Sequence, residues 1–371
     1  MVDKLLGEDF ITQGPRIAAF EKGLCKYTGA RHAVACSSGT AALHIAACAA
    51  GIGSLDEVIT SPLTFLASAN CILYCGGKVV FSDIEDDTGN LDVRLLSAKI
   101  GRRTKAIIPV HYAGLPCDLS AISRIARLHD IVVIEDAAHA LGASYRNDKI
   151  GSCRYSDMTI LSFHPVKSIT TAEGGAVLTN RKDLYERLCL YRSHGITKDP
   201  FNFIGSRAGS AGPWYYEMQV LGFNYRMNDI EATLGIAQLA KLDGFIAIRR
   251  RIAKTYNEAF AGNPYFELPV ERPRSVSACH LYPIRLSARC IASRKDIVIS
   301  LRKAGLGAQV HYIPVYLHPY YGKLGYRKGI CPQAEKFYGR EISIPLYPSL
   351  RRDEIAYVIK TMLSVCKRYS G

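Results

Sequence analysis

The sequence predicts an α/β protein, with a large domain built on a mostly parallel sheet flanked by helices and a smaller C-terminal α+β domain. Short β-branched runs alternate with amphipathic helical patterns through the first two-thirds of the chain, which is typical of such a sheet. The 371 residues are too many for one ordinary core. Apolar residues make up 48% of the chain and charged residues 22%, which excludes disorder and a coiled coil.

The larger predicted domain contains the clearest elements. Apolar runs at Lys105–Val110, Ile131–Glu135 and Met158–Phe163 predict strands that are buried on both faces. Asp118–His129 is amphipathic and predicts a helix between the first two of them. Phe201–Pro213 is rich in glycine and predicts a surface loop.

We place the domain boundary between residues 245 and 246, so that residues 1–245 form the large domain and residues 246–371 the small one. One predicted helix, Asp229–Phe260, crosses this boundary, and its Arg249-Arg250-Arg251 run is expected on a solvated face. The remaining predicted elements are strand His280–Leu286, helix Ser293–Ala304, strand Ala308–Tyr312 and helix Asp353–Lys367.

The charge balance leaves several classes of partner open. Forty-seven Lys and Arg against thirty-three Asp and Glu give a net charge of +14, which suits nucleic acid, a membrane surface or a phosphorylated small molecule. A DNA-binding regulator is the alternative from a different class. The basic residues are dispersed and show no helix-turn-helix pattern, so we expect no nucleic-acid partner. The uncharged stretches Ala33–Leu55 and Val58–Gly77 contain many small residues, and we expect interior segments rather than membrane spans.

Cysteine usage indicates a reducing compartment. The twelve cysteines are scattered, with no CxxC pair and no Cys/His run at zinc spacing, so we expect reduced thiols and no metal site. The first ten residues are charged every few positions and carry no signal-peptide core. We therefore expect a cytoplasmic protein.

Lys167 is the strongest candidate for chemistry. A buried strand ends near Ser162, Pro165 turns the chain, and Lys167 follows before the Gly174-Gly175 pair. A lysine just beyond a strand's carboxyl end points into the crevice where open α/β sheets bind ligands. Partial desolvation there lowers a lysine pKa and favours Schiff-base formation. The structural alternative is a surface lysine in a loop.

Polar residues near the ends of other predicted strands belong to the same candidate site. Asp136 could pair with the protonated pyridine nitrogen of pyridoxal phosphate (PLP), although a helix N-cap would explain it too. His139 follows three residues later, and a buried core histidine is its alternative. Ser37–Thr40 precedes an Ala-rich helix and could bind one phosphate, or Ser37 or Ser38 could simply cap that helix. Phe65 could stack on a cofactor ring or belong to the core.

Several motifs carry a family resemblance. They are Gly39-Thr40-Ala41-Ala42-Leu43, Glu135-Asp136-Ala137-Ala138-His139, Ser162–Lys167 and Leu221–Met227. Together they resemble the DegT-type nucleotide-sugar aminotransferases, which are fold-type I PLP enzymes, and the similarity runs from about Ile11 to the C-terminus. His139–Gly142, Ile169–Gly175, Arg192–Gly195 and Gln309–Tyr312 resemble the branch that acts in pseudaminic acid biosynthesis.

The resemblance implies a role for each matching residue. Lys167 and Asp136 would be catalytic, Lys167 as the Schiff-base lysine and Asp136 as the partner of the pyridine nitrogen. Phe65 would stack on the ring, and His139 would lie near its 3-hydroxyl. The phosphate would be bound by Ser38, Gly39, Thr40 and Ser162, with Asn224 reaching it from the other subunit of a homodimer. The expected substrate residues are Asp9, Phe10, Ile11, Thr12, Gly39, Ser162, Asn224, His311, Tyr312, Ile313 and Pro314.

The resemblance also implies a reaction. An amino group would pass from an amino acid, with L-glutamate as the expected donor, to C4 of a UDP-linked 4-keto-6-deoxy-N-acetylhexosamine. Other keto sugars on UDP, dTDP or GDP stay open as alternatives. Dehydratases of the family carry His in place of the lysine, and Lys167 argues against that activity. Family members usually begin further upstream, with an aromatic residue that lines the substrate site, so part of that site is expected to be absent or remodelled.

Overall fold

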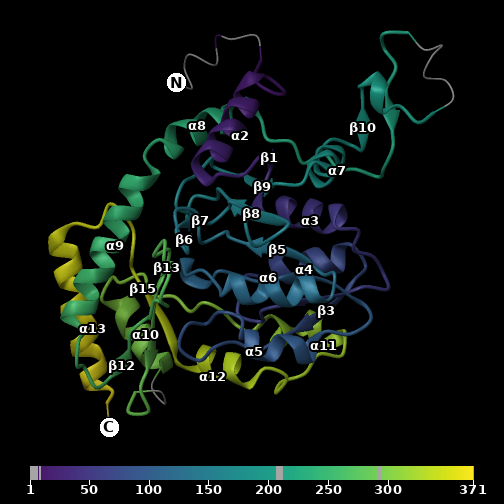
Figure 1. Ribbon diagram of the computed structural model, residues 1–371. Coiled ribbons are helices and arrows are strands. Elements are labelled where there is room, and N and C mark those ends of the chain that lie inside the picture. The colour runs from purple at the N-terminus through teal and green to yellow at the C-terminus, as the bar shows by residue number, and fades with distance from the viewer. Residues whose placement is uncertain (1–6, 8–9, 206–211, 291–293, 371) are drawn as a thin grey trace.

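The largest element of the protein is a seven-stranded sheet (Figure 1). A computed structural model describes residues 7, 10–205, 212–290 and 294–370. The strand order is β1-β9-β8-β5-β4-β2-β3. The bounds are β1 (His32–Cys36), β2 (Glu57–Thr60), β3 (Lys78–Phe81), β4 (Thr104–Ile108), β5 (Val132–Asp136), β8 (Met158–Ser162) and β9 (Gly175–Thr179). All pairings are parallel except the two made by β9. The predicted mostly parallel sheet is therefore confirmed, and the three predicted strands correspond to β4, β5 and β8.

Helices cover both faces of this sheet. The helices α3 (Gly39–Ala49), α4 (Ala67–Tyr74) and α7 (Lys182–Arg192) share one apolar cluster on the first face. The second face is covered by α2 (Pro15–Thr28), α5 (Val93–Leu96), α6 (Leu119–Leu128) and α8 (Asp229–Leu239). Successive strand residues point to opposite faces. Accordingly, Ile134 of β5 packs in the first cluster, and its neighbour Val133 packs against α5 and α6.

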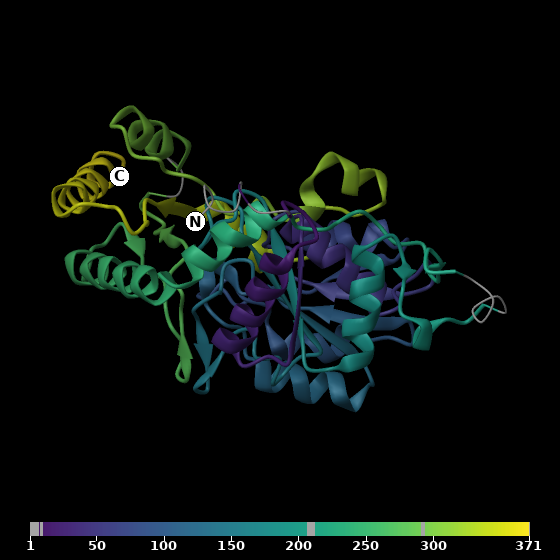
Figure 2. The same ribbon diagram turned by 90° about the horizontal axis from the view of Figure 1, so that it is seen from above.

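A smaller antiparallel sheet lies to one side of the first (Figures 1 and 2). Its strands are β12 (Phe266–Glu267), β14 (Tyr282–Leu286) and β15 (Glu341–Ile344), and its helices are α9 (Leu242–Ala259), α10 (Arg294–Lys303) and α13 (Arg352–Arg368). Tyr256, Ile284, Leu301 and Met362 are buried in one cluster there. The boundary predicted at residues 245/246 falls inside α9 and stays a prediction.

Part of the C-terminal third returns to the seven-stranded sheet. The returning elements are the 3₁₀ turn η5 (Val315–Leu317), α11 (Pro319–Lys323) and α12 (Pro332–Arg340). Tyr316, Tyr321 and Phe337 are buried in the same cluster as α3 and α4. The Asp83 carboxylate, which follows β3, accepts the N–H groups of Gln333 and Ala334 at 2.9 Å each. An aspartate from the first half of the chain therefore stabilises the first turn of α12.

Two short ribbons complete the described structure. One contains β6 (Ser144–Tyr145), β7 (Asp148–Lys149) and β13 (Ser275–Val276), so it joins distant parts of the chain. The other pairs β10 (Ile196–Thr197) with β11 (Glu217–Met218) and projects from the side opposite α9 and α13 (Figures 1 and 2). The predicted surface loop Phe201–Pro213 lies between β10 and β11, and residues 206–211 fall outside the described part.

Three expectations were wrong in detail. The helix predicted over Asp229–Phe260 is two helices, because the chain breaks between α8 and α9. The strand predicted over Ala308–Tyr312 is limited to one bridge, between Gln309 and Ser343. Arg249 was expected in solvent but is 4% exposed. Its Nη1 donates to the carbonyl oxygens of His280 at 3.2 Å and Leu346 at 2.9 Å, so this guanidinium joins α9 to two other segments.

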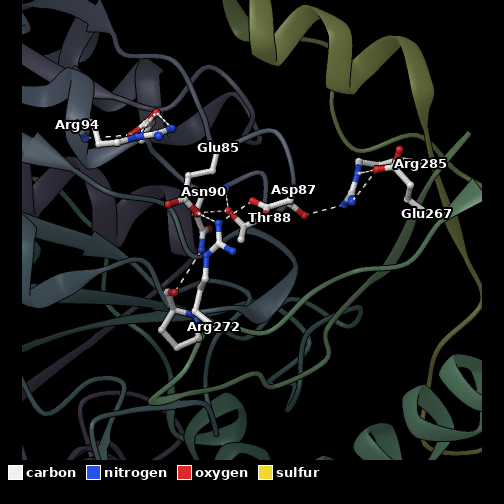
Figure 3. Close-up of polar contacts among 10 residues, drawn as sticks. Glu85, Asp87, Thr88, Asn90, Arg94, Glu267, Arg272 and Arg285 are labelled. Atoms are coloured by element: carbon white, nitrogen blue, oxygen red, sulfur yellow. Dashed lines mark hydrogen bonds and ion pairs between the residues drawn. The ribbon is translucent and has the colours of Figure 1, made fainter. Parts of the chain in front are cut away.

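Arginines also join the two sheets through an acidic loop after β3 (Figure 3). The Arg272 guanidinium contacts Glu85 Oε2 at 3.2 Å and Asp87 Oδ1 at 2.7 Å. Arg285 on β14 donates to the Asp87 carbonyl oxygen at 2.6 Å and pairs with Glu267 at 3.1 Å. Arg272 and Asp87 are half-exposed, so that pair contributes at most about 1 kcal/mol. Arg285 is buried, and its hydrogen bond to Asp87 links the smaller sheet to the loop after β3.

Two further observations concern the lengths of the described helices and the state of the cysteines. Among the described residues, no helix is both long and apolar enough to cross a membrane. All twelve cysteines are free thiols, and each of them is buried or half-buried.

Candidate functional site

A cavity of about 340 Å³ lies at the carboxyl edge of the seven-stranded sheet. Its lining comes from segments that follow the parallel strands, and the carboxyl ends of parallel strands share one edge. The lining residues include Ser38, Gly39 and Thr40 after β1, Thr64, Phe65 and Ser68 after β2, Val110 after β4, Asp136 and His139 from the end of β5, and Ser162 and Lys167 from the end of β8. The structure thus brings together eight predicted cofactor residues that are far apart in the sequence.

Two glycines allow the start of α3 to pack closely against β8 and β9 at one wall of the cavity. A Cβ atom at Gly39 would lie 2.8 Å from Cβ of Ser162, and one at Gly175 would lie 2.4 Å from the Ser38 carbonyl oxygen. The start of α3 can therefore touch both β8 and β9 only because neither glycine carries a side chain.

Ser38 is the N-cap of α3, and its Oγ accepts the Ala41 N–H at 3.0 Å. The capping alternative considered for this serine is what the structure shows. The amide groups of Gly39 and Thr40, in the first turn, have no acceptor within the helix. Both residues border the cavity, so the N-terminus of α3 presents donors and a partial positive charge to an anion there.

Lys167 lies in the turn between β8 and β9 and lines the cavity. Its backbone N–H donates to the His164 carbonyl oxygen at 2.9 Å, which closes the turn after the strand. Burial lowers the pKa of its amine to about 8, although the nearby Asp136 carboxylate opposes that shift. A lysine with this pKa supplies much more uncharged amine near neutral pH than an exposed one, as a nucleophile requires.

Asp136 is the last residue of β5 and is 5% exposed. Its Oδ2 accepts the Ser68 hydroxyl at 2.5 Å, and its Oδ1 accepts the Ala138 N–H at 3.1 Å. Thr64 Oγ1 lies 2.7 Å from Ser68 Oγ, so a short chain of hydroxyls holds the carboxylate. The carboxylate caps the following turn and also borders the cavity.

His139 and Tyr312 form the wall beside Asp136. The Tyr312 hydroxyl lies 3.2 Å from His139 Nε2, whereas His139 Nδ1 is buried without a hydrogen-bond partner among the described residues. Burial, reinforced by the Lys167 charge, holds the pKa of His139 well below its ordinary value. His280 packs against this imidazole with ring centroids 4.3 Å apart, and burial lowers its pKa in the same way. Burial therefore favours the neutral form of both imidazoles.

The cavity and its residues fit an aromatic aldehyde that carries a phosphate. The volume lies within the range of about 300–1,000 Å³ that is usual for small-molecule sites. The N-terminus of α3 suits the phosphate, Lys167 suits the aldehyde and Asp136 suits a protonated ring nitrogen. Phe65 is 59% exposed, so its ring is free to cover a planar ligand. His139 also lines the cavity, and its buried Nδ1 has no hydrogen-bond partner among the described residues.

The other predicted substrate residues lie outside the lining of this cavity. Asn224 is exposed and forms a bridge with Ser193. Phe10 and Ile11 are more than half exposed, and Thr12 bridges Asn228 near the start of α8. Asp9 lies outside the described residues.

The residues around Tyr312 are positioned by the smaller sheet. His311 N–H donates to Glu341 Oε2 at 2.7 Å, and Ile313 is 42% exposed. Pro314 ends this segment and accepts the Leu317 N–H at 2.8 Å. Tyr312 alone of the predicted 311–314 group lines the cavity.

Sequence reasoning missed Ser68, Thr64 and His280. Ser68 hydrogen-bonds Asp136, a residue sixty-eight positions away, so no local pattern could have paired them. A usable signal was the presence of hydroxyl side chains in the otherwise apolar stretch around α4. His280 had been assigned only to a strand, and the structure places it behind His139 instead.

A second cavity, of about 450 Å³, lies where the two sheets meet. Basic side chains, namely Arg250, Arg251, Lys254 and Arg285, contribute to its lining. It contains none of the predicted site residues, and its volume alone does not make it the reactive site.

The parallel sheet, the lysine beyond a strand end and the helix N-terminus beside it define the class of fold-type I PLP-dependent enzymes. Comparison with known families agrees, because residues 1–363 match the DegT/DnrJ/EryC1/StrS aminotransferase family. The chain belongs to this family of PLP-dependent aminotransferases.

Two relatives with known names are similar to the chain over nearly its whole length. The chain is 39% identical to the Bacillus subtilis spore coat polysaccharide biosynthesis protein SpsC over 369 residues, which covers 99% of the chain and 93% of SpsC. It is also 39% identical to the UDP-4-amino-4,6-dideoxy-N-acetyl-beta-L-altrosamine transaminase of Campylobacter jejuni, covering 98% of the chain and 93% of that enzyme.

Solved structures show the same overall arrangement. PseC of Helicobacter pylori, an aminotransferase of pseudaminic acid biosynthesis, superposes with a TM-score of 0.91 at 35% identity, covering 99% of this chain and 95% of PseC. The PLP form of the Streptococcus pneumoniae sugar aminotransferase Spr1654 gives 0.91 at 31% identity, covering 100% and 96%. The predicted family and fold class are therefore confirmed.

Proposed function

We propose that this enzyme transfers an amino group from L-glutamate to C4 of a UDP-linked 4-keto-6-deoxy-N-acetylhexosamine, as a cytoplasmic homodimer. The single observation that carries the chemistry is the pairing, across one cavity, of the partly desolvated Lys167 amine with the buried Asp136 carboxylate. The choice of sugar rests on similarity to the C. jejuni and H. pylori proteins.

Lys167 would bind PLP as a Schiff base, with the phosphate at the N-terminus of α3 and at the Ser162 hydroxyl. When bound, PLP supplies a ring that accepts the electron pair left when a proton leaves the amino-acid substrate. Asp136 would hold the proton on the ring nitrogen, and Ser68 and the Ala138 N–H fix the orientation of its carboxylate. The Lys167 amine would accept and return protons at Nζ.

His139 and Phe65 complete the cofactor site in this proposal. Phe65 would cover one face of the ring, and His139 would lie near the ring hydroxyl. A neutral imidazole there can donate or accept a hydrogen bond without adding charge.

The cofactor linkage is tested by borohydride reduction of the purified protein. Because Lys167 lies in the cavity with a pKa of about 8, reduction should fix PLP on the peptide that contains Lys167. Lys167→Ala should lose turnover by several orders of magnitude, while Lys182→Ala, a change at an exposed surface pair, should leave it unaltered. A label on another lysine would refute the assignment.

The substrate is tested by a panel of keto nucleotide sugars. Mass spectrometry after incubation with L-glutamate should show amination of the UDP-linked 4-keto-6-deoxy-N-acetylhexosamine at least about tenfold faster than of a UDP-4-keto-pentose or of dTDP- and GDP-keto-deoxyhexoses. Faster amination of one of those sugars would contradict the proposed substrate and identify that sugar as the substrate instead. A colourless, inactive protein that binds DNA would instead favour the regulator.

The shared site is tested by mixing inactive subunits. Asn224 is exposed and does not line the cavity of its own subunit, which supports a role at the partner's phosphate. Lys167→Ala and Asn224→Ala subunits should regain activity when mixed, since one site in each mixed dimer keeps both residues. Light scattering should give about twice 40.8 kDa. Mixed dimers without activity, after proven exchange, would rule out the shared site.

A further inference from the structure

Two thiols and one imidazole meet at the ends of α3 and α4 that lie away from the PLP site. His44 and Cys48 are one turn apart on α3 and therefore share a face of that helix. Cys75 is the C-cap residue of α4. The two sulfur atoms are 3.6 Å apart, and a ring nitrogen of His44 lies within 4.8 Å of both.

Cys75 differs from every other cysteine of the chain because its thiol pKa is lowered rather than raised. A hydrogen bond from the Cys48 thiol lowers the pKa of Cys75, hydrogen bonding from His44 adds to this, and burial opposes both. The pKa of Cys48 is raised by the same contact. Burial raises the pKa of each of the ten remaining thiols. These contacts therefore favour the thiolate on Cys75, and the thiolate is the reactive form of cysteine.

The surroundings of the pair hold His44 in place and leave both cysteines half-buried. His44 Nδ1 lies 3.2 Å from the Tyr225 hydroxyl, and its ring packs against Phe223 with centroids 4.6 Å apart. Cys48 and Cys75 are both half-buried, whereas the adjacent Cys71 is fully buried. A small oxidant can thus reach the pair in preference to the buried thiols.

We propose that Cys75 and Cys48 form a reversible, hydroperoxide-sensitive thiol pair, with Cys75 as the attacking and Cys48 as the resolving residue. The Cys75 thiolate attacks one peroxide oxygen, the O–O bond breaks, and sulfenic acid and hydroxide form. The Cys48 thiol then attacks the sulfenic sulfur, and water leaves as the disulfide forms. Overall, two thiols are oxidised and one hydrogen peroxide is reduced to two water molecules.

The two sulfur atoms already lie close together. The sulfur atoms must approach from 3.6 Å to about 2.05 Å, the S–S bond length. The resulting disulfide would tie the end of α3 to the end of α4. The opposite end of α3 carries Gly39 and Thr40, and α4 carries Ser68, so oxidation would couple to the elements that form the PLP site.

The experiment uses the full-length, PLP-loaded enzyme, reduced and freed of metal with a chelator. One equivalent of hydrogen peroxide should join Cys48 to Cys75 with loss of two hydrogen atoms, at least about tenfold faster than any other cysteine reacts, and dithiothreitol should reverse it. Trypsin alone leaves both cysteines in one peptide, because no Lys or Arg occurs from His32 to Gly77. Additional cleavage at Glu57 separates them for mass spectrometry.

Matched variants assign the two roles. Cys48→Ser should stop the reaction at Cys75 sulfenic acid, which dimedone traps, whereas Cys75→Ser should leave Cys48 unmodified. Cys71→Ser should behave as the unmodified sequence. Circular dichroism confirms that each variant is folded. Reaction at Cys75 no faster than at other thiols, or a disulfide elsewhere, would overturn the proposal. So would a pair that binds zinc but stays unoxidised after zinc is removed.

Discussion

Glu135 and Asp136 are adjacent carboxylates on one strand, yet their surroundings differ completely. Glu135 is 2% exposed and points away from the cavity. It accepts from His111 Nε2 at 2.9 Å and Thr159 Oγ1 at 3.3 Å, and it contacts Ser156. His111 Nδ1 in turn accepts the Cys117 N–H at 3.1 Å. Asp136 faces the other side of the sheet, where Ser68 and Ala138 hold it against a cavity.

This difference separates a structural carboxylate from one available for chemistry. Each polar atom around Glu135 has a protein partner, so there is no place for a ligand. Beside Asp136, the Nδ1 atoms of His139 and His280 are buried without a partner among the described residues, and the amine of Lys167 is partly desolvated. Burial alone does not mark a functional carboxylate. An adjoining cavity and neighbouring polar atoms without hydrogen-bond partners are what distinguish the functional carboxylate.

The largest effect is expected for Asp136→Asn. The amide keeps the size of the side chain but cannot hold a proton on the ring nitrogen, so kcat should fall about 10²–10⁴-fold. The midpoint of urea unfolding should change little. If Asp136 only capped the turn, the variant would instead lose about 1 kcal/mol of stability and keep its rate.

Glu135→Gln is the matched control on the opposite face. The amide weakens the charge-assisted bond from His111 and places an N–H₂ group in a buried network. The free energy of unfolding should therefore fall by about 2 kcal/mol, while kcat of the folded protein stays within about threefold. Urea unfolding and steady-state kinetics measure both. A loss of rate with unchanged stability would show that the two carboxylates do not divide their roles as described.

The dependence of stability on pH tests whether the Lys167 amine is desolvated. In the PLP-free protein, Lys167 has a pKa of about 8 against an ordinary 10.5. Between these values the unfolded chain binds more protons than the folded protein, so stability from this group rises with pH. Below about pH 8 the folded protein bears the full free-energy cost of keeping the buried Lys167 amine protonated. Relative to Lys167→Met, the melting temperature should gain a few degrees from pH 8 to pH 10.5. A constant difference would mean that Lys167 is not desolvated.

The smallest effect is expected for Ser68→Ala. The Asp136 carboxylate remains, but it loses the hydroxyl that orients it. A lost hydrogen bond of about 1 kcal/mol corresponds to roughly a fivefold drop in kcat. Ser156→Ala, beside Glu135, should lower stability without lowering kcat. Equal rates for Ser68→Ala and the unmodified enzyme would remove Ser68 from the site.

The parts of the site that the sequence predicted are those set by local pattern. Strand ends, turn residues and the Ala-rich helix placed Lys167, Asp136 and Gly39 at one edge of the sheet, because parallel strands bring their carboxyl ends together. The pairing of Ser68 with Asp136 and the contact of Cys48 with Cys75 depend on how α3 and α4 pack, which no local pattern encodes.

The wrong predictions have the same origin. Residues 308–312 have an apolar pattern that fits a strand, but only Gln309 finds a partner, so β-propensity alone could not form a ladder. Arg249 belongs to a run of three arginines whose burial depends on which side of α9 faces the smaller sheet. A charged triplet does not contain that information.

The return of residues 315–337 to the first sheet has a consequence for biosynthesis. Tyr316 and Tyr321 pack against Phe81, Phe337 belongs to the same core, and Asp83 accepts two N–H groups of α12. A ribosome that has released only the first three hundred residues has therefore exported every strand of the seven-stranded sheet but not the aromatic side chains that cover its β3 edge. That nascent sheet exposes an apolar face while translation continues. The cover of this face is complete only once residues 315–337 have emerged and packed against it.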